Sequence, residues 1–500
     1  MTSSRDEGMP ENRDSSARNR GILAIGAYAP GNRVTAEAFA EAWGRFDAPG
    51  VETTAVPDAD EDSLTMGVEA AHRALAAGEA EGEAAGDAAG EVAGGADGGD
   101  VDHLAFATTT LPLEEEDLTA RLASYLGVPA GASRRVVGGS TRAGIDALVD
   151  AIEVTGTALV VAADCPRGEP DDPREHAAGA GAAALLVGDG APAVVTDRAT
   201  HGDPRPGTRF RRRGSVNVEG LDVGTYERAA FVEPVEAAVD ALDDSATADV
   251  DAIALQAPDG KLPYRTDLDA EAIAAVETVS ALGDTAAASV PLSLATAFAD
   301  GHDRVLAVGW GSGGGATALA IEGSAPVERS IEATAELDYP SYLRRRGDIV
   351  GDTPDGGAAH VPVPTWRRSL PQRHRLEAGR CPECGAVAFP PSGACPDCRQ
   401  LVEYESVEPD PRGTVEAVTR IGQGGAPPEF AAQQARQGAF GVAIVGFHVR
   451  GDADGHFTVP MQVVGEEDVE PGDPVRPAPR LIYVEEGVPR YGLKARPLSA

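Results

Sequence analysis

The sequence predicts a layered α/β domain over residues 21–322, followed by a small cysteine-bearing module that ends in a β-barrel. Three observations predict this order. Apolar strand-like runs alternate with helical patterns as far as Glu322. Four of the five cysteines then fall within residues 381–398. Only short β-type runs separated by turns follow them, and such runs fit a small closed barrel better than another α/β unit.

The first domain opens at Gly21 with the apolar segment GILAIGAYAP, which reads as a strand. A glycine turn at 311–315 separates its last two strands. The other strands are expected at residues 101–110, 158–163, 182–187, 250–255, 304–308 and 316–321. Helices are expected at residues 62–75, 116–126, 232–242 and 269–282.

Composition marks the boundaries of these regions. Residues 1–20 are polar and predict a disordered tail. Residues 76–100 predict a flexible acidic insertion, because their eight glycines each oppose a helix by about 1 kcal/mol. Residues 323–375 predict a linker with a short helix near Tyr339–Arg346, and it leads to a zinc-ribbon region at 376–402. The barrel is expected over 403–500, with strands at 414–421, 441–449, 457–464 and 481–484.

The charge balance indicates habitat and excludes several classes of protein. Asp and Glu total 80 against 42 Lys and Arg, and the only lysines are Lys261 and Lys494. This pattern is typical of the cytoplasm of a salt-loving microbe, where salt screens self-repulsion. A generic acidic protein is the alternative. A net charge of −38 opposes nonspecific binding to nucleic acid. We expect no membrane span, no secretory signal and no disulfide scaffold, which favours a cytoplasmic location.

The four clustered cysteines predict a metal site. Cys381 and Cys384 form one CxxC pair, and Cys395 and Cys398 form a second pair ten residues later. Four thiolates presented by two tight turns make a closed tetrahedral zinc site, and Gly385 eases the turn after the first pair. Because no coordination position stays open, the zinc is expected to be structural. Redox pairs and surface disulfides are the alternatives.

The C-terminal segments RLEAGRCPECGAVAFPPSGACPDC, GTVEAVTR, GAFGVAIVGF and RYGLKARP resemble the zinc-ribbon plus OB-fold family associated with acyl-CoA enzymes, over roughly residues 335–498. The resemblance implies a rubredoxin-like ribbon and an OB-fold barrel. It also implies a thiolase-superfamily enzyme as partner, because archaeal members resemble subunits that bridge a thiolase and 3-hydroxy-3-methylglutaryl-CoA (HMG-CoA) synthase. An OB-fold alone would suggest single-stranded nucleic acid, but aromatic and basic residues are sparse.

Residues 21–322 resemble archaeal HMG-CoA synthase, a member of the thiolase superfamily. The resemblance is carried by GILAIGAYAP, DEDSLTMGVEAAHRAL, GAGAAALLVGDG, QAPDGKLPYR, LGDTAAASVPLSLATAF and RVLAVGWGSGGGATAL. It implies two similar halves, roughly 21–195 and 213–322, in a five-layer αβαβα domain. It further implies a coenzyme A thioester as ligand and a homodimer formed through the first half.

The resemblance also locates the catalytic positions, and there the sequence departs from the family. Such a synthase needs a nucleophilic cysteine, a histidine, an asparagine and a glutamate. Thr141 stands at the place of the cysteine and Gln256 at that of the histidine. Asp284 replaces the asparagine, and the glutamate aligns near Thr109. These residues predict a degenerate synthase, because a threonine without a base is a weak nucleophile and Asp284 opposes an oxyanion.

The leading hypothesis is therefore an acyl-CoA-binding pseudoenzyme that serves as a scaffold or accessory subunit in acyl-CoA or isoprenoid-precursor metabolism. Lys261, Arg211 and Arg212 are candidates to contact the phosphates of coenzyme A. The alternative is an active acyl-CoA synthase, acyltransferase or lyase/aldolase with other catalytic residues. Tyr28, Tyr226 and Tyr264 would then be acid–base candidates.

Three further candidates have plainer interpretations. Cys165, the cysteine outside the zinc set, is more typical of core packing than of a nucleophile. Glu175 and His176 could supply a relocated acid–base pair, but adjacent residues rarely converge on one atom. The glycines at 311–315 lack the helix and GK[ST] of a phosphate loop and favour a simple turn.

Overall fold

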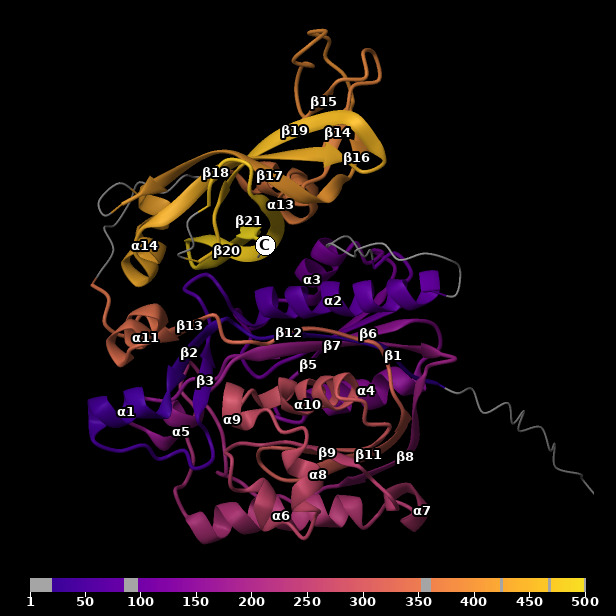
Figure 1. The fold of residues 1–500 in the computed structure, drawn as a ribbon, viewed down its shortest axis with the longest axis vertical. Coiled ribbons are helices and arrows are strands. Elements are labelled where there is room, and N and C mark those ends of the chain that lie inside the picture. Colours follow the sequence, from indigo (N-terminus) through magenta and orange to yellow (C-terminus); the bar gives the residue numbers. More distant parts are fainter. Residues whose placement is uncertain (1–19, 85–97, 352–360, 423–425, 466–468, 499–500) are drawn as a thin grey trace, which may run out of the picture.

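The structure of the chain is a computed structural model that describes residues 20–84, 98–351, 361–422, 426–465 and 469–498. A large layered domain carries a smaller β-rich module over one face (Figure 1). Strands of this module lie above helices α2 (Ser63–Ala84) and α3 (Thr119–Leu126) of the large domain. The predicted sequence of an α/β domain, a ribbon and a curled β-module is confirmed.

One mixed sheet organises the large domain. Its first half has the order β5-β4-β6-β7-β1 and its second half the order β8-β11-β10-β9, while β12 pairs with β1. The halves meet where Gly21 and Ile22 of β1 pair with Val194 and Ala193 of β8. The strands are β1 (Arg20–Tyr28), β4 (His103–Ala107), β5 (Ser133–Val137), β6 (Ala158–Asp164), β7 (Gly181–Asp189), β8 (Ala193–His201), β9 (Ala252–Leu255), β10 (Arg304–Trp310), β11 (Ala316–Gly323) and β12 (Val327–Ser330).

Helices separate and cover the two half-sheets. Helices α4 (Ala143–Glu153) and α10 (Ser289–Ala299) pack between them, and α2 and α3 cover the outer face of the first half. Helices α6 (Gly224–Val239) and α8 (Ala270–Ala274) cover the second half. Three buried hydrophobic clusters fill the interfaces between these layers. The result is the predicted five-layer αβαβα arrangement (Figure 1).

The strands between helical layers were the most predictable elements. Every residue of β6 is buried, and β7 is buried at all but two positions. Strands covered on both faces carry unbroken apolar runs, which explains why their predicted bounds agree with the structure to within a few residues. Strand β8 is different: it pairs with β11 in the second half-sheet, so the second half begins near residue 193 and not at the predicted residue 213.

Two helix predictions need correction. Helix α6 begins eight residues before the predicted 232–242 segment. The single helix predicted at 269–282 is two short helices, α8 and α9 (Val279–Leu282). The Asp269 side chain caps the first helix, and the Glu277 carboxylate accepts from Ser280 N at 3.0 Å. A second helix begins beside this hydrogen bond, so the predicted segment is divided into two helices.

Parts of the predicted insertion and linker belong to the large domain. Helix α2 continues to Ala84, so the first nine residues of the predicted loop 76–100 are helical, while 85–97 lie outside the described residues. The tail is undescribed except Arg20, which begins β1. Within the predicted linker 323–375, the short helix α11 (Tyr339–Arg346) is confirmed, but β12 and β13 (Ala335–Leu337) join sheets of the large domain.

Further short elements complete the large domain and the linker. A three-stranded sheet has the order β13-β2-β3. The elements are β2 (Asn32–Thr35), α1 (Ala36–Trp43), β3 (Thr53–Val56), α5 (Pro173–Ala177), α7 (Asp244–Thr247), η1 (Pro263–Arg265), η2 (Ala286–Ala288), α12 (Val363–Arg368) and α13 (Leu370–Arg375). Among the helices in the described part of the chain, none is long and apolar enough to cross a membrane.

The C-terminal module consists of a ribbon and a curled sheet. The ribbon strands are β14 (Ala378–Arg380), β15 (Val387–Ala388) and β16 (Glu405–Val407). The larger sheet has the order β19-β18-β17-β20-β21, and the bridge between Val463 and Ala495 brings its two edges together into a half-barrel. Its elements are β17 (Pro409–Ile421), η3 (Pro428–Phe430), α14 (Ala431–Gln437), β18 (Phe440–Val449), β19 (Asp452–Gln462), β20 (Pro474–Glu485) and β21 (Val488–Pro497).

Buried ion pairs hold this module against the large domain. Arg480 of β20 is fully buried and lies 2.6 Å from Glu61, 3.6 Å from Asp60 and 3.7 Å from Glu69. Lys494 of β21 donates to Asp60 Oδ2 at 2.6 Å. The three carboxylates come from the start of α2 and the loop before it. Acidic residues of the first domain thus neutralise basic residues of the last.

Candidate functional site

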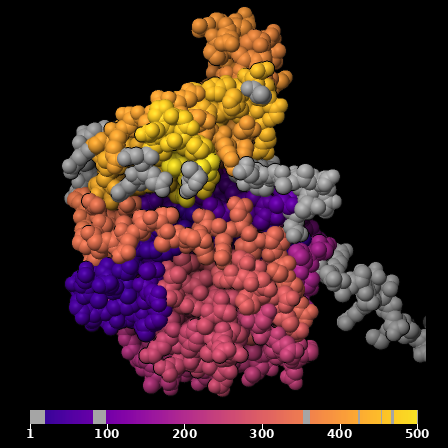
Figure 2. All heavy atoms as spheres, viewed as in Figure 1, coloured from indigo at the N-terminus to yellow at the C-terminus, as the bar shows by residue number. Residues whose placement is uncertain are grey.

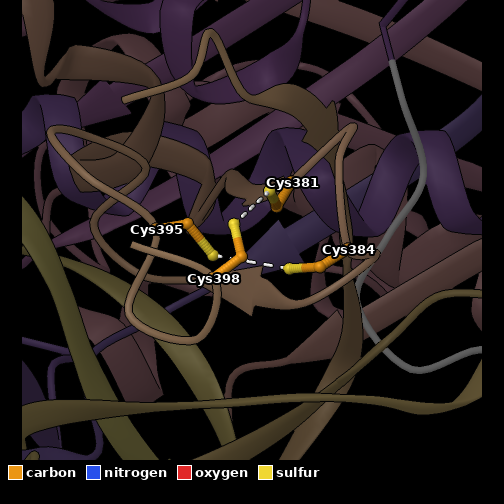
Figure 3. A group of neighbouring side chains, drawn as sticks. All are labelled: Cys381, Cys384, Cys395 and Cys398. Atoms are coloured by element: carbon orange, nitrogen blue, oxygen red, sulfur yellow. Dashed lines mark hydrogen bonds between the residues drawn. The ribbon is translucent and has the colours of Figure 1, made fainter. Parts of the chain in front are cut away.

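The four cysteines of the ribbon converge on one point (Figure 3). Cys381 Sγ lies 3.8 Å from Cys398 Sγ, and Cys384 Sγ lies 3.6 Å from Cys395 Sγ. Four sulfurs bound to zinc at about 2.3 Å form a tetrahedron with edges of about 3.8 Å, so the set fits this ion. These separations are too long for disulfide bonds.

Two matching turns present the thiolates. In the first turn Gly385 N donates to Cys381 O at 2.9 Å, and in the second Arg399 N donates to Cys395 O at 3.0 Å. Gly385 has a φ of 77°, which explains why a glycine suits this position. Arg399 adopts the same left-handed conformation at 64°. All four side chains are committed to a closed site, so a bound zinc ion would be structural.

Thr141 lies just before helix α4, at the place expected for a nucleophile. Its buried hydroxyl donates to Trp310 O at 2.7 Å and accepts from Ser312 N at 3.1 Å. Both contacts tie the turn before α4 to the glycine turn after β10. The hydroxyl therefore has structural partners, and among the described residues no basic side chain is hydrogen-bonded to it.

Gln256 and Asp284 are held by the short helix η2. Gln256 Nε2 donates to Ala286 O at 2.9 Å, and Asp284 Oδ1 accepts from Ala286 N at 2.9 Å. The second oxygen of Asp284 forms an ion pair with Arg209. Both Gln256 and Asp284 are almost completely buried. The polar atoms expected to face a substrate are instead bound to protein.

Thr109 contacts Asp164 at the end of β6, a residue that was not predicted from the sequence to belong to the site. Asp164 Oδ1 accepts from Thr109 N at 2.8 Å and from the hydroxyls of Thr108 at 2.9 Å and Thr110 at 2.6 Å. Its other oxygen accepts from Ala287 N at 2.9 Å. Burial raises the pKa of Asp164, and these hydrogen bonds oppose the shift.

A signal for Asp164 was present in the sequence. Strands β4 and β6 are parallel neighbours, so polar residues that follow them meet at one sheet edge. The segment ALVVAAD ends in a carboxylate, and three consecutive threonines follow β4. Through η2, Asp164 also connects to the backbone that holds Gln256 and Asp284. The structure thus brings Thr109, Gln256 and Asp284 to one place, around residues 284–287, whereas Thr141 is bound to the turn after β10.

A cavity of about 380 Å³ lies beside this place. Asp284, Arg209 and Trp310 line it, whereas Thr109, Thr141 and Gln256 do not. The remaining lining residues are Asp47, Ala48, Pro166, Pro173, Arg174, Ala177, Ala178, Thr208, Val218, Asp222, Gly224, Glu227, Phe231, Pro258, Asp259 and Leu262. A ligand in this cavity would meet the Arg209–Asp284 pair rather than the hydroxyl of Thr141.

The three basic residues expected to contact coenzyme A phosphates lie in different surroundings. Lys261 is exposed and does not line the cavity, although the next residue in the chain, Leu262, does. The Arg211 guanidinium is half-buried, and burial lowers its pKa despite the nearby Asp164. Arg212 pairs with Glu219 on an exposed loop. The structure does not gather these three residues into one group.

Cys165, Glu175 and His176 lie in surroundings typical of residues that stabilise the fold, as expected from the sequence. Burial raises the pKa of the Cys165 thiol to about 12, and Asp62 and Asp164 add to the shift. Glu175 accepts from Tyr339 at 3.1 Å, whereas the His176 ring stacks on Phe46. Glu175 and His176 therefore contact different partners and do not converge.

The tyrosines considered as acid–base groups do not line the cavity of about 380 Å³. Tyr28 is buried against the C-terminal module, where it accepts from Arg496 at 3.0 Å. Tyr226 donates to Pro206 O at 2.9 Å. Tyr264 is 39% exposed.

Both parts of the chain are similar to known proteins. Residues 368–402 match the family described as "ChsH2, rubredoxin-like zinc ribbon domain". The chain is 28% identical over 360 residues to hydroxymethylglutaryl-CoA synthase of Aeropyrum pernix, covering 66% of this chain and 95% of the relative. It is also 28% identical over 349 residues to the enzyme of Thermococcus onnurineus, covering 64% and 91%.

Solved structures show the same fold. MvaS in complex with 3-hydroxy-3-methylglutaryl coenzyme A has a TM-score of 0.54 at 18% identity, covering 69% of this chain and 95% of that one. A synthase described as HMG_CoA synthase complexed with CoA has a TM-score of 0.53 at 16% identity, with the same coverage. The large domain therefore has the thiolase fold. Together with the relatives, this makes it an HMG-CoA synthase-like thiolase domain, joined here to a ChsH2-type zinc ribbon.

Proposed function

We propose that this chain binds acyl-CoA without condensing it and acts as a scaffold or accessory subunit for a thiolase-superfamily enzyme. The observation that carries this proposal is the engagement of Thr141, Gln256 and Asp284 by neighbouring protein atoms. A condensing enzyme needs an activated nucleophile and donors aimed at the developing oxyanion. Here the hydroxyl has no base, the amide cannot take a proton and Asp284 carries a negative charge.

Ligand binding is supported by the cavity and by the nature of the related structures. A volume of about 380 Å³ suits a small acyl group with part of its carrier. Solved relatives of this fold hold coenzyme A or its thioester. Because carboxylates such as Asp222, Glu227 and Asp259 line the cavity, phosphates are expected outside it, near Lys261.

Calorimetric titration of the full chain with acetyl-CoA and acetoacetyl-CoA in concentrated KCl tests this proposal. We expect saturable binding that Lys261→Gln weakens several-fold, whereas the matched control Arg212→Gln leaves it unchanged. A coupled thiol assay should detect no release of coenzyme A above the solution background. Robust condensation that disappears in Thr141→Ala would overturn the proposal, as would the absence of both acyl-CoA binding and association with a thiolase.

A second candidate function is an active acyl-CoA enzyme with other catalytic residues. The observation that favours it is the buried Arg209–Asp284 pair on the wall of the cavity, since a carboxylate there could act on a bound thioester. A broad panel of acyl-CoA thioesters distinguishes the two functions. Turnover that is lost in Asp284→Asn favours the enzyme, and no turnover across the panel favours the scaffold.

The setting of the protein is part of the proposal. The zinc ribbon projects from the end of the module farthest from the large domain, where a partner enzyme could reach it (Figure 2). Free thiolates at a zinc site suit a reducing cytoplasm.

A homodimer would use strand β5, at the edge of the first half-sheet. If the acidic surface reflects a halophilic archaeon, the denaturation midpoint should rise steadily with KCl.

A further inference from the structure

A second, smaller cavity of about 110 Å³ lies between the large domain and the C-terminal module. Its walls come from the end of β3 and the following loop, the segment after β6, helix α11 and helix α14. It shares only Pro166 and Ala178 with the lining of the cavity of about 380 Å³. It is therefore a separate compartment, and none of the synthase-like positions lines it.

Four guanidinium groups line this small cavity, and three of them have carboxylate partners. Arg346 lies 3.0 Å from Glu175 and 2.8 Å from Asp348. Arg167 lies 2.6 Å from the same Asp348. The third guanidinium group with a carboxylate partner belongs to Arg345, the residue immediately before Arg346.

Arg345 forms an ion pair with Asp58, one of the two acidic residues of the lining. The other is Glu61, which lies 2.6 Å from Arg480 and accepts a hydrogen bond from Tyr28. The carboxylates at this cavity are therefore bound to other groups, and they leave the fourth guanidinium unmatched.

The unmatched cation is Arg436 of helix α14. Its Nε donates to Arg345 O at 2.7 Å, and within the described ranges no carboxylate oxygen lies within 4.0 Å of it. Burial lowers the pKa of Arg436, and the neighbouring Arg167 and Arg345 add to the shift, while the more distant carboxylates of Asp60 and Asp348 oppose it. Arg167 also has a buried Nε without a hydrogen-bond partner. A largely buried cation beside like charges is unfavourable unless an anion accompanies it.

We propose that this cavity binds a small oxyanion of the phosphate class, held by Arg436 and Arg167. Guanidinium groups bind such oxyanions through paired, charge-assisted hydrogen bonds. A volume of about 110 Å³ exceeds the space of a single water several-fold and admits a group of this size. Because Arg436 belongs to the module and Arg167 to the large domain, the anion would also join the two parts.

Calorimetric titration of the full chain with sodium phosphate, at constant ionic strength in NaCl, tests the proposal. We expect saturable binding of one phosphate per chain. Arg436→Gln and Arg167→Gln should each weaken it at least tenfold. The matched control is Arg344→Gln, an exposed arginine of helix α11 that does not line the cavity, and it should change the affinity less than twofold.

The absence of saturable phosphate binding to the wild-type chain would overturn the proposal, and that measurement requires no variant to fold. Equal affinities in the wild type and both cavity variants would also overturn it. Coenzyme A titrated with and without phosphate identifies the natural source: competition indicates a phosphate group of the coenzyme, and independence indicates a free anion. Lys261→Gln should leave phosphate binding unchanged, so failure of the acyl-CoA proposal is distinguishable from failure of this one.

Discussion

Asp284 and Arg209 show at the scale of single residues how the synthase-like site has been closed. An asparagine at position 284 could point an amide toward an oxyanion, whereas the aspartate attracts a guanidinium into the same space. The Asp284 side chain is 3% exposed and that of Arg209 is 13% exposed, so the pair is shielded from water. Such a pair is sensitive to the loss of one partner, because the other charge then remains buried.

The variant Asp284→Asn tests this view. It keeps an oxygen that can accept from Ala286 N but removes the charge that neutralises Arg209. We expect it to lower the free energy of unfolding by about 3–5 kcal/mol, measured by chemical denaturation. The double variant Arg209→Met/Asp284→Leu should recover most of this loss, because it leaves no buried charge. Additive losses in the double variant would contradict a direct pairing.

The zinc ribbon is the element whose structure depends most on a single bound group. Its strands are two or three residues long. Of its four cysteines, only Cys381 and Cys395 are buried. The ribbon contributes only a few residues, such as Leu376 and Ala378, to the hydrophobic cluster of the barrel, whereas the layers of the large domain have clusters of their own. A small domain without a substantial core usually needs a metal to fold.

Metal removal tests the role of this element. A strong chelator should release about one zinc ion per chain and make residues 381–398 sensitive to protease, while the near-ultraviolet signal of the large domain persists. Cys395→Ser should lose the zinc, and the matched control Cys165→Ser, outside the four-cysteine set, should retain it. Retention of a fully protected ribbon after zinc release would contradict a structural role.

The interface between the two parts decides the shape of the whole molecule. Its core is a set of buried charges, with Arg480 and Lys494 on the barrel and acidic residues around the start of α2. Neither charge set is stable alone in a dry interface, so each requires the other. A protein with a net charge of −38 thus uses arginine to neutralise the acidic residues that it buries.

Arg480→Met tests the strength of this interface. The variant leaves Asp60, Glu61 and Glu69 with one fewer cation, and we expect it to weaken docking by about 3–5 kcal/mol. Small-angle scattering should show a larger radius of gyration as the module separates. The matched control Arg412→Met, exposed on the same module, should keep the wild-type dimensions. Unchanged dimensions in Arg480→Met would show that the apolar contacts suffice.

The stability of the interface should also depend on pH. Burial alone would raise the pKa of Glu69, but Arg476, Arg496 and Arg73 outweigh it and hold that pKa well below 4.5. Stability from Glu69 is therefore present above about pH 4.5 and is lost as the pH falls further. Burial raises the pKa of Asp58 from 3.8 to about 6, so its contribution is full below about pH 3.8 and is lost as the pH rises from there to about 6.

These opposite shifts predict an interface that is most stable at about pH 4, because the Glu69 contribution rises only up to about pH 4.5 and the Asp58 contribution falls between about pH 3.8 and 6. Denaturation midpoints measured from pH 3 to 8 at constant salt should pass through a maximum there. Glu69→Gln should remove the fall on the acid side. A midpoint that rises steadily through pH 8 would contradict the assignment for Asp58.

The sequence by itself determined the features that depend on local pattern and spacing. Buried strands such as β6 and β7 carry continuous apolar runs, and the two CxxC pairs define the zinc ligands whatever surrounds them. Thr141, Gln256 and Asp284 were located by resemblance, and the absence of a thiol there follows from their chemistry.

The tertiary structure alone decided what those residues contact. Asp164 became a central acceptor because parallel strands β4 and β6 end side by side. Asp284 forms an ion pair with Arg209, which lies 75 residues away in the sequence. Arg480, in the C-terminal module, forms an ion pair with Glu61 of the large domain. Local patterns report which face of an element is buried, but a partner distant in sequence is fixed only when the layers pack.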